Sequence, residues 1–145
     1  MDFPGVALIT GAASGIGKAT ALRYALEGCK RIVISDINTI DLLATQKEIE
    51  RKYSDVSVAS IAVDVTSYES VQNMVDEAVR KFGRIDYCAN NAGILRFGDT
   101  ASLPVEQFEL VYQVNLRGVF FCAKAEINAM LKQEPLTSKY DKTFT

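Results

Sequence analysis

The chain has 145 residues, a length that predicts one domain, and 48% of them are hydrophobic while 23% are charged. Its 16 Lys and Arg against 18 Asp and Glu leave a formal net charge of -2, which gives no electrostatic basis for binding nucleic acid or an anionic membrane. The sequence contains no histidine, which excludes Ser-His-Asp and Cys-His nucleophile systems and histidine-ligated metal sites within it. We therefore expect no metal site.

Three cysteines, Cys29, Cys88 and Cys122, lie far apart and lack the C-x-x-C spacing of a zinc or redox site. Each lies in or beside an apolar stretch, which predicts buried, reduced thiols in a cytoplasmic protein. The first five residues are acidic and carry no basic segment, which argues against a signal peptide. No apolar run approaches the roughly 18–20 residues that a membrane span needs.

Short apolar runs rich in β-branched residues predict four strands, at residues 6–9, 31–35, 58–63 and 85–89. Segments with the apolar period of a helix lie between them. The first helix is expected to begin near Gly15, with Gly28 as its C-cap, and the second to begin near Asn38, a good N-cap. Strands that alternate with helices predict parallel pairing.

The third helix has the clearest end signals. Thr66 followed by Glu69 predicts a capping box, and Gly83 predicts the helix end. After Pro104 a longer helical pattern continues to about Leu131. Its apolar stripe consists of Leu116, Val119, Phe120, Ala123, Ile127 and Met130.

The sequence therefore predicts an α/β fold, with a parallel sheet in the strand order 3-2-1-4 and helices on both faces. We assign residues 1–131 to this domain and residues 132–145 to a polar tail. The fourth strand is expected to be an edge strand, with its free backbone groups and the apolar helix stripe open to water or to another chain.

A glycine-rich loop follows the first strand directly and opens the first helix. Gly11, Gly15 and Gly17 allow a tight turn and a close approach of the backbone to a ligand, and Ser14 adds a hydroxyl donor. The N–H groups at a helix start suit a pyrophosphate; the alternative is a purely structural turn. Ala19 stands where a P-loop needs Ser or Thr, which argues against nucleoside triphosphate hydrolysis. The segment reads Thr10-Gly11-Ala12-Ala13-Ser14-Gly15-Ile16-Gly17.

Asp36 lies 19 residues after Gly17, at the carboxyl end of the second predicted strand. A carboxylate there accepts hydrogen bonds from the adenosine ribose and repels a 2′-phosphate, and no Lys or Arg stands beside it. The sequence therefore favours NAD over NADP. The alternative role for Asp36 is a charge near the N-terminus of the following helix.

Polar turns also close the third and fourth predicted strands. Asp64 and Val65 follow the third strand, and the run from Asn90 to Gly93 follows the fourth. Open α/β sheets bind ligands at the carboxyl ends of their strands, where the strand order reverses. Either segment alone fits a capped turn; together with the glycine-rich loop they favour a ligand crevice.

These residues, with the pair Val114-Asn115 in the long helix, resemble the short-chain dehydrogenase/reductase family over about residues 6–131. The resemblance implies a Rossmann fold and a nicotinamide cofactor. It implies that the 11–17 loop, with Ile16, holds the pyrophosphate, that Asp36 holds the ribose, and that Asp64 and Val65 contact the adenine. It further implies that Asn90 and Gly93 line the nicotinamide side. Asn115 resembles the helix asparagine that holds a water in the family's proton relay; its alternative is a polar residue at a helix kink.

The family's active site continues into a fifth strand, a catalytic serine and a Tyr-x-x-x-Lys motif, which this sequence lacks. Tyr140 is followed four residues later by Phe144, and Ser138 lies in the same polar tail. We therefore expect a truncated or partial product of a longer reductase that is inactive alone.

The resemblance implies an oxidoreductase that transfers a hydride between a nicotinamide cofactor and a small alcohol or ketone. The alternative is a non-catalytic dinucleotide-binding or interaction module. We also expect homo-oligomers that form through the long helix.

Overall fold

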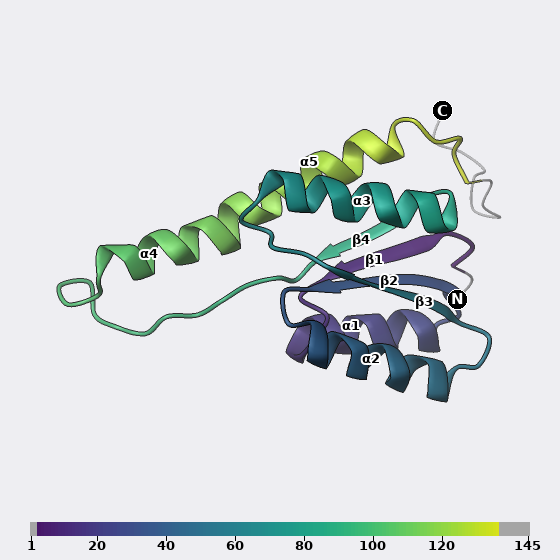
Figure 1. Ribbon diagram of the computed structural model, residues 1–145, viewed down its shortest axis with the longest axis horizontal. Helices are drawn as coiled ribbons and strands as arrows, with labels where there is room; N and C mark the ends of the chain where they lie inside the picture. Colours follow the sequence, from purple (N-terminus) through teal and green to yellow (C-terminus); the bar gives the residue numbers. More distant parts are fainter. Residues whose placement is uncertain (1–2, 137–145) are drawn as a thin grey trace, which may run out of the picture.

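The computed structural model describes residues 3–136, and Figure 1 shows the order of their elements. The strands are β1 (Val6–Thr10), β2 (Arg31–Asp36), β3 (Ser57–Ala62) and β4 (Tyr87–Asn90). The helices are α1 (Gly15–Leu26), α2 (Thr39–Lys52), α3 (Tyr68–Phe82), α4 (Val105–Tyr112) and α5 (Val119–Met130), with a π-helix, η1 (Gln113–Gly118), between the last two. The strands form one parallel sheet in the order β3-β2-β1-β4, which confirms the predicted topology.

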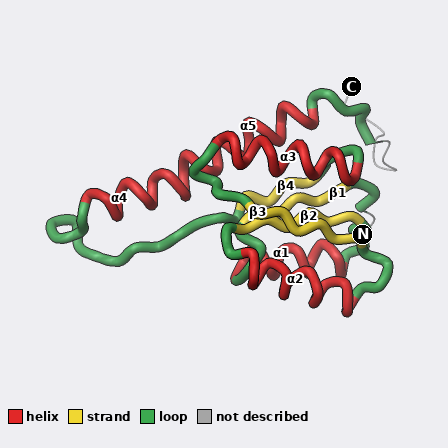
Figure 2. Tube along the Cα trace, in the orientation of Figure 1, coloured by secondary structure: helices red, strands yellow, loops and turns green. Residues whose placement is uncertain are grey.

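Helices cover both faces of the sheet, as Figure 2 shows, with α1 and α2 on one face and α3 and α5 on the other. Alternate strand residues point to opposite faces. Leu8 and Val33 pack with α3 and α5, whereas Ile9 and Ile32 pack with α1 and α2. Because both faces are covered, every residue of β1 is buried, and the strand reads as a continuous apolar run.

The start of α3 differs from the prediction by one residue. Ser67 is the N-cap, and its side chain accepts a hydrogen bond from the backbone N–H of Ser70 at 3.2 Å. Thr66 instead donates to Oδ1 of Asp64, from its backbone N–H at 2.9 Å and its hydroxyl at 2.7 Å. The predicted capping box of Thr66 and Glu69 is therefore wrong, because Thr66 closes the turn that follows β3.

The predicted long helix is interrupted by the π-helix η1, whose wider turn accommodates an extra residue. Gly118, at the end of η1, is buried against Val65, and a Cβ at this glycine would lie 2.9 Å from Cγ2 of Val65. Arg117 donates from Nη2 to the backbone oxygen of Thr66 at 3.3 Å. The π-turn thus lies where the helix passes the loop that follows β3.

The two helices on either side of η1 are buried to different extents. The loop after β4 and helix α4 extend away from the sheet (Figure 1), and no residue of α4 is buried. Helix α5 packs against α3 through Cys122 and Ala125. Part of the predicted apolar stripe faces outward, with Leu116, Phe120 and Ile127 between 54% and 61% exposed. In the described part of the chain β4 is an outer strand, as expected.

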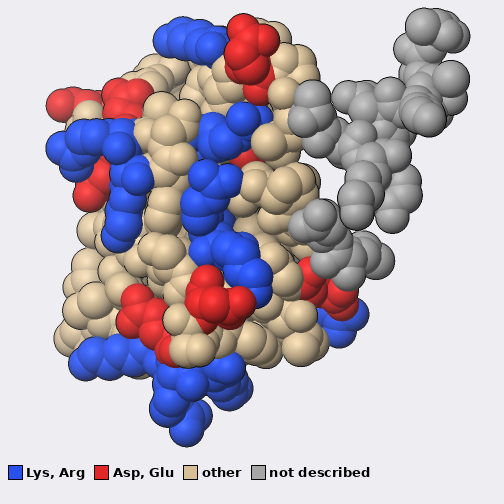
Figure 3. All heavy atoms as spheres, turned by 90° about the vertical axis from the view of Figure 1, so that its right-hand side faces the viewer, with Lys and Arg blue, Asp and Glu red and all other residues tan. Residues whose placement is uncertain are grey.

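Basic residues gather at the end of the sheet opposite to the loops that follow the strands (Figure 3). The last turns of α1, α2 and α3 carry Arg23, Arg51 with Lys52, and Arg80 with Lys81. Cations stabilise the carboxyl end of a helix dipole, so helix stability accounts for this distribution. None of the helices within residues 3–136 is long and apolar enough to cross a bilayer.

Candidate functional site

A cavity of about 720 Å³ opens at the carboxyl ends of the strands, where the sheet order reverses between β1 and β4. Its walls come from the glycine-rich loop, the turns after β2, β3 and β4, and the region around α4. Most of the residues predicted from the sequence line it: Gly11, Ser14, Gly15, Ile16, Gly17, Asp36, Asp64, Val65 and Gly93. Five separate segments of the chain therefore meet in one crevice.

The glycine-rich loop presents its backbone to this crevice. A Cβ at Gly17 would lie 2.1 Å from the backbone oxygen of Gly11, so the loop can fold back on itself only with glycine at this position. Gly15 has a φ of +51°, and a Cβ there would meet no atom within 4 Å, so its open side is free for a ligand. The N-cap Ser14 makes no side-chain capping hydrogen bond. The N–H groups of the first turn of α1 are therefore not capped by a side chain and suit an anion.

Asp36 holds the glycine-rich loop in addition to lining the crevice. Its Oδ2 accepts a hydrogen bond from the backbone N–H of Ala13 at 3.0 Å, and its Oδ1 accepts one from the backbone N–H of Asn38 at 2.9 Å. The carboxylate is half-buried at the end of β2. Each oxygen keeps a further lone pair, so Asp36 can accept hydrogen bonds from a ligand while it fixes the loop.

The turn after β4 is tied to the strand beside it. The backbone N–H of Ala92 donates to Oγ1 of Thr10 at 3.2 Å, and Nδ2 of Asn91 reaches Oγ1 of Thr20 at 3.5 Å. A Cβ at Gly11 would lie 2.7 Å from the backbone oxygen of Asn91, which shows how closely the two loops approach. These contacts fix the wall of the crevice that the turn after β4 forms.

Asn115 does not line the cavity, although it lies beside it in η1. Its Oδ1 accepts from the backbone N–H of Ile94 at 2.9 Å, and its Nδ2 donates to the backbone oxygen of Ile94 at 2.8 Å. Ile94 itself lines the cavity. The side chain of Asn115 therefore holds the loop after β4, and the role of water holder in a proton relay stays a prediction.

Asn90 also lies outside the cavity lining. Its side chain points to the face of the sheet covered by α5, where Nδ2 donates to Oε2 of Glu126 at 2.8 Å. The cofactor-binding role suggested for Asn90 stays a prediction, and its observed contacts connect the end of β4 to α5.

Sequence reasoning missed several residues of the crevice. Ile37 directly follows Asp36, lines the crevice and is 72% exposed. An apolar residue directly after the end of a strand is a sequence signal that could have identified it. Arg96 lies in an irregular loop and donates from Nε to Oε1 of Gln107 at 2.7 Å. Asn91, Ala92 and Val114 line the crevice as well, and they belong to segments that the sequence analysis named without giving these residues a role. The remaining missed residues carry no local signal: Val63, Thr66, Ile94 and Leu110.

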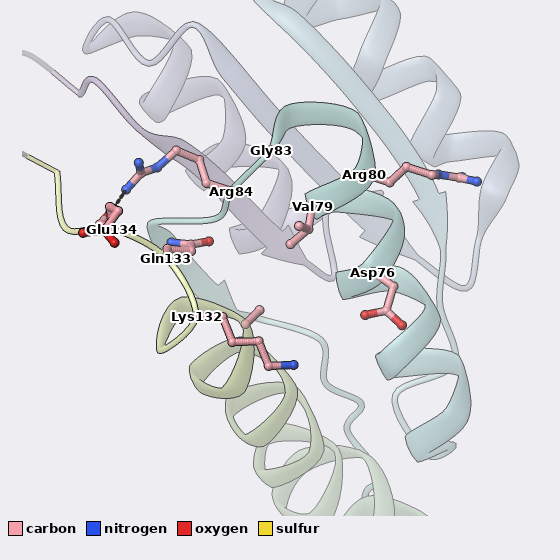
Figure 4. A pocket seen from close by; sticks show the side chains of 9 residues that line it. Asp76, Val79, Arg80, Gly83, Arg84, Lys132, Gln133 and Glu134 are labelled. Atoms are coloured by element: carbon pink, nitrogen blue, oxygen red, sulfur yellow. Dashed lines mark hydrogen bonds between the residues drawn. The ribbon is translucent and has the colours of Figure 1, made fainter.

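A second cavity, of about 450 Å³, lies between the end of α3 and the segment after α5 (Figure 4). Acidic and basic side chains both line it, among them Asp76, Arg80 and Lys132. Arg84 is engaged there, because its guanidinium pairs with Asp86 at 2.7 Å and donates to the backbone oxygen of Glu134 at 3.2 Å. None of the predicted site residues lies in this cavity.

The segment after α5 is attached to the domain at this end. Gln133 accepts from the backbone N–H of Ile85 and donates to its backbone oxygen, both at 2.8 Å. Ser138 and Tyr140 lie outside the described residues. Within residues 3–136 no group of three or more His, Cys, Asp or Glu side chains is arranged to hold a metal ion.

The parallel sheet, its strand order and its covered faces define a Rossmann-like α/β protein. A family model described as short chain dehydrogenase matches residues 5–135, which is most of the chain. The chain belongs to the short-chain dehydrogenase/reductase family.

Individual relatives agree with this assignment. The short-chain dehydrogenase anuF of Penicillium roqueforti is 41% identical over 141 residues, which cover 94% of this chain. The structure of NAD⁺-bound xylitol dehydrogenase superposes with a TM-score of 0.82 at 39% identity over 88% of the chain. The structure of an actinorhodin polyketide ketoreductase variant with NADPH superposes with a TM-score of 0.81 at 35% identity over 86% of the chain. The chain spans about half the length of these proteins, 51%, 48% and 47% respectively.

Proposed function

We propose that this chain is the cofactor-binding part of an oxidoreductase that transfers a hydride between a nicotinamide dinucleotide and an alcohol or ketone. The observation that carries the proposal is the crevice at the reversal of strand order, with an uncapped helix start on one wall and Asp36 at its end. The dinucleotide supplies the hydride chemistry when bound. The protein supplies binding and orientation.

The residues present fit such a cofactor. The backbone N–H groups around Gly15 can donate hydrogen bonds to a pyrophosphate, because a Cβ at Gly15 would meet no atom within 4 Å and no side chain fills this space. Asp64, Val65 and Ile37 lie along the same crevice and can contact an adenine. Gly93 and Ile94 line the wall formed by the turn after β4, where the nicotinamide would lie.

We infer that the cofactor is NAD. Asp36 carries a negative charge where a 2′-phosphate would lie in NADP, and the next residue is Ile37. Arg96 is the single Lys or Arg among the described residues that line the crevice, and it lies in the loop that follows β4. No cation of the crevice wall therefore neutralises a phosphate beside Asp36.

Asn115 is proposed as a positioning residue. Its two hydrogen bonds to Ile94 engage both the donor and the acceptor of its carboxamide. The side chain thereby sets the path of the loop that forms the nicotinamide side of the crevice. The wall of the crevice and the π-turn are coupled through this residue.

A second candidate function is a non-catalytic dinucleotide-binding or interaction module. It is supported by the exposed apolar side chains of η1 and α5. We propose that this face pairs with a second copy of the chain, since contiguous exposed apolar surface marks protein interfaces.

Cys29 and Cys122 are buried free thiols, which supports a cytoplasmic location.

Two experiments test these functions. Isothermal titration of the folded chain with NAD and NADP tests the crevice, and we expect NAD to bind more tightly. An assay that follows NADH absorbance with a panel of ketones tests turnover, and we expect none from this chain alone. Failure to bind either dinucleotide, by a sample with cooperative unfolding, would overturn the proposal; turnover would reject the non-catalytic alternative.

A further inference from the structure

A buried carboxyl group lies between α5 and the end of β4, outside the crevice. Glu126 is 2% exposed, and its Oε2 accepts a hydrogen bond from Nδ2 of Asn90 at 2.8 Å. Within residues 3–136 no lysine or arginine forms an ion pair with Glu126. An ionised carboxylate is rarely buried without a cation, because desolvation of the charge is costly.

Two buried oxygens of this pair lack a hydrogen-bond partner: Oδ1 of Asn90 and Oε1 of Glu126. Both are acceptors when the carboxyl group is ionised, so each would bear the cost of an unsatisfied buried group. They belong to two planar groups that a hydrogen bond already joins through Nδ2 and Oε2. A single proton on Glu126, donated to Asn90, would satisfy both oxygens together.

We propose that Glu126 is a neutral acid in the folded protein and donates its proton to Oδ1 of Asn90, so that two hydrogen bonds join α5 to the end of β4. This acid–amide pair is a positioning device. Asn90 is the last residue of β4, and the turn of residues 91–93 that follows it forms one wall of the crevice.

The surroundings of Glu126 favour the neutral form. Burial raises the pKa of Glu126, and the contacts with Asn90 and the Cys88 thiol oppose this only in part. Burial also raises the pKa of Cys88, and that of Cys122 to about 12, so both thiols stay protonated around Glu126. From α3 the groups packed on this core are apolar: Val71, Met74, Val75 and Ala78. Asp86, further along the β4 side, is paired with Arg84.

The proton itself is tested by infrared spectroscopy at neutral pH. We expect the native chain to show the carbonyl band of a protonated carboxylic acid, and Glu126→Gln to lose it. The matched control is Glu77→Gln, at an exposed glutamate of α3, which should keep the band. A native spectrum without the band, or a band that survives Glu126→Gln, would overturn the proposal.

Stability against pH gives a second, independent test. Because the folded pKa of Glu126 is raised, the stabilisation from the neutral pair is fully present below the unfolded pKa and is lost as the pH rises through the folded pKa. The carboxamide that Glu126→Gln introduces has no acidic proton to lose and keeps both hydrogen bonds. The free energy of unfolding of this variant should therefore exceed that of the native chain by a margin that grows with pH. A margin independent of pH would contradict the proposal.

The positioning role rests on the proposed function only where cofactor affinity is measured. Hydrogen exchange of the amides of residues 91–94 needs no cofactor, and Glu126→Leu should accelerate it about tenfold while Glu126→Gln restores slow exchange. If NAD binds, Glu126→Leu should also weaken its affinity. If NAD does not bind, the proposed function fails, but the exchange data still test whether the acid–amide pair of Glu126 and Asn90 holds the turn. Equal exchange rates in all three proteins would reject the positioning role. If Glu126→Leu does not fold, the exchange rates of the native chain and of Glu126→Gln, compared above and below the folded pKa of Glu126, test the same role.

Discussion

Gly15 and Gly83 have similar backbones in different surroundings, which makes them a matched pair. Their φ angles are +51° and +80°, and a Cβ at either would meet no atom within 4 Å. Gly15 lines the crevice, whereas Gly83 ends α3 at the opposite end of the sheet. Alanine at each site should cost about 1–2 kcal/mol through backbone strain alone.

We predict that Gly15→Ala weakens NAD binding by about tenfold or more, since its methyl group fills the space where the backbone would approach the pyrophosphate. Gly83→Ala should lower the melting temperature by about as much as Gly15→Ala does, but it should leave NAD affinity unchanged. Isothermal titration and thermal unfolding of both variants provide the measurements. Equal losses of affinity in the two would argue against the crevice.

Asp36 both holds the glycine-rich loop and sets the charge beside the ribose position, and the choice of substitution separates these roles. Asp36→Asn removes the charge but keeps an oxygen for the backbone N–H of Ala13. We expect NADP affinity to rise roughly tenfold, because the repulsion of a 2′-phosphate is removed. Competitive titration with both dinucleotides measures the ratio. A ratio unchanged from the native chain would reject the role of Asp36 in cofactor choice.

At the scale of elements, η1 connects the crevice wall to the helix behind it. Asn115→Ala removes both hydrogen bonds to Ile94, each with a net worth of about 1 kcal/mol. We expect faster hydrogen exchange of the loop after β4 and weaker NAD binding. Asn128→Ala, at an exposed position of α5, is the control and should change neither. The same exchange in both variants would contradict a positioning role for Asn115.

Across the whole molecule, an apolar face runs along η1 and α5 without a covering element among the described residues. Leu116, Phe120 and Ile127 are 60%, 61% and 54% exposed, and their spacing of four and seven residues places them on one side of the helix. We predict a concentration-dependent dimer in sedimentation velocity that Phe120→Glu dissociates. The control is Ile40→Glu on α2, an equally apolar exposed site across the sheet, which should leave the dimer intact. A native chain that stays monomeric at all concentrations would disprove the pairing.

The order of elements could be predicted from the sequence because its signals are local. Apolar runs, helix periods and glycines lie within a few residues of the structure they specify, and right-handed crossovers then restrict the topology. The crevice followed from the same logic, since parallel strands bring their carboxyl ends to one edge. The predicted ends of helices and strands differ from the observed ones by one or two residues where hydrogen bonds of a turn, such as that of Thr66 with Asp64, compete with a helix cap.

The sequence by itself therefore determined the parallel sheet, the glycine-rich loop and the acid at the end of β2. Only the tertiary structure decided that Asn115 holds Ile94, that Asn90 faces Glu126, and which side of α5 is buried. Each of these contacts joins residues at least 21 positions apart. No periodic pattern encodes such a pairing, because it depends on how whole helices are placed on the sheet. The apolar stripe of the sequence consequently could not indicate that Glu126, an acidic residue, lies on the buried side of α5, whereas the packing of the helix shows it.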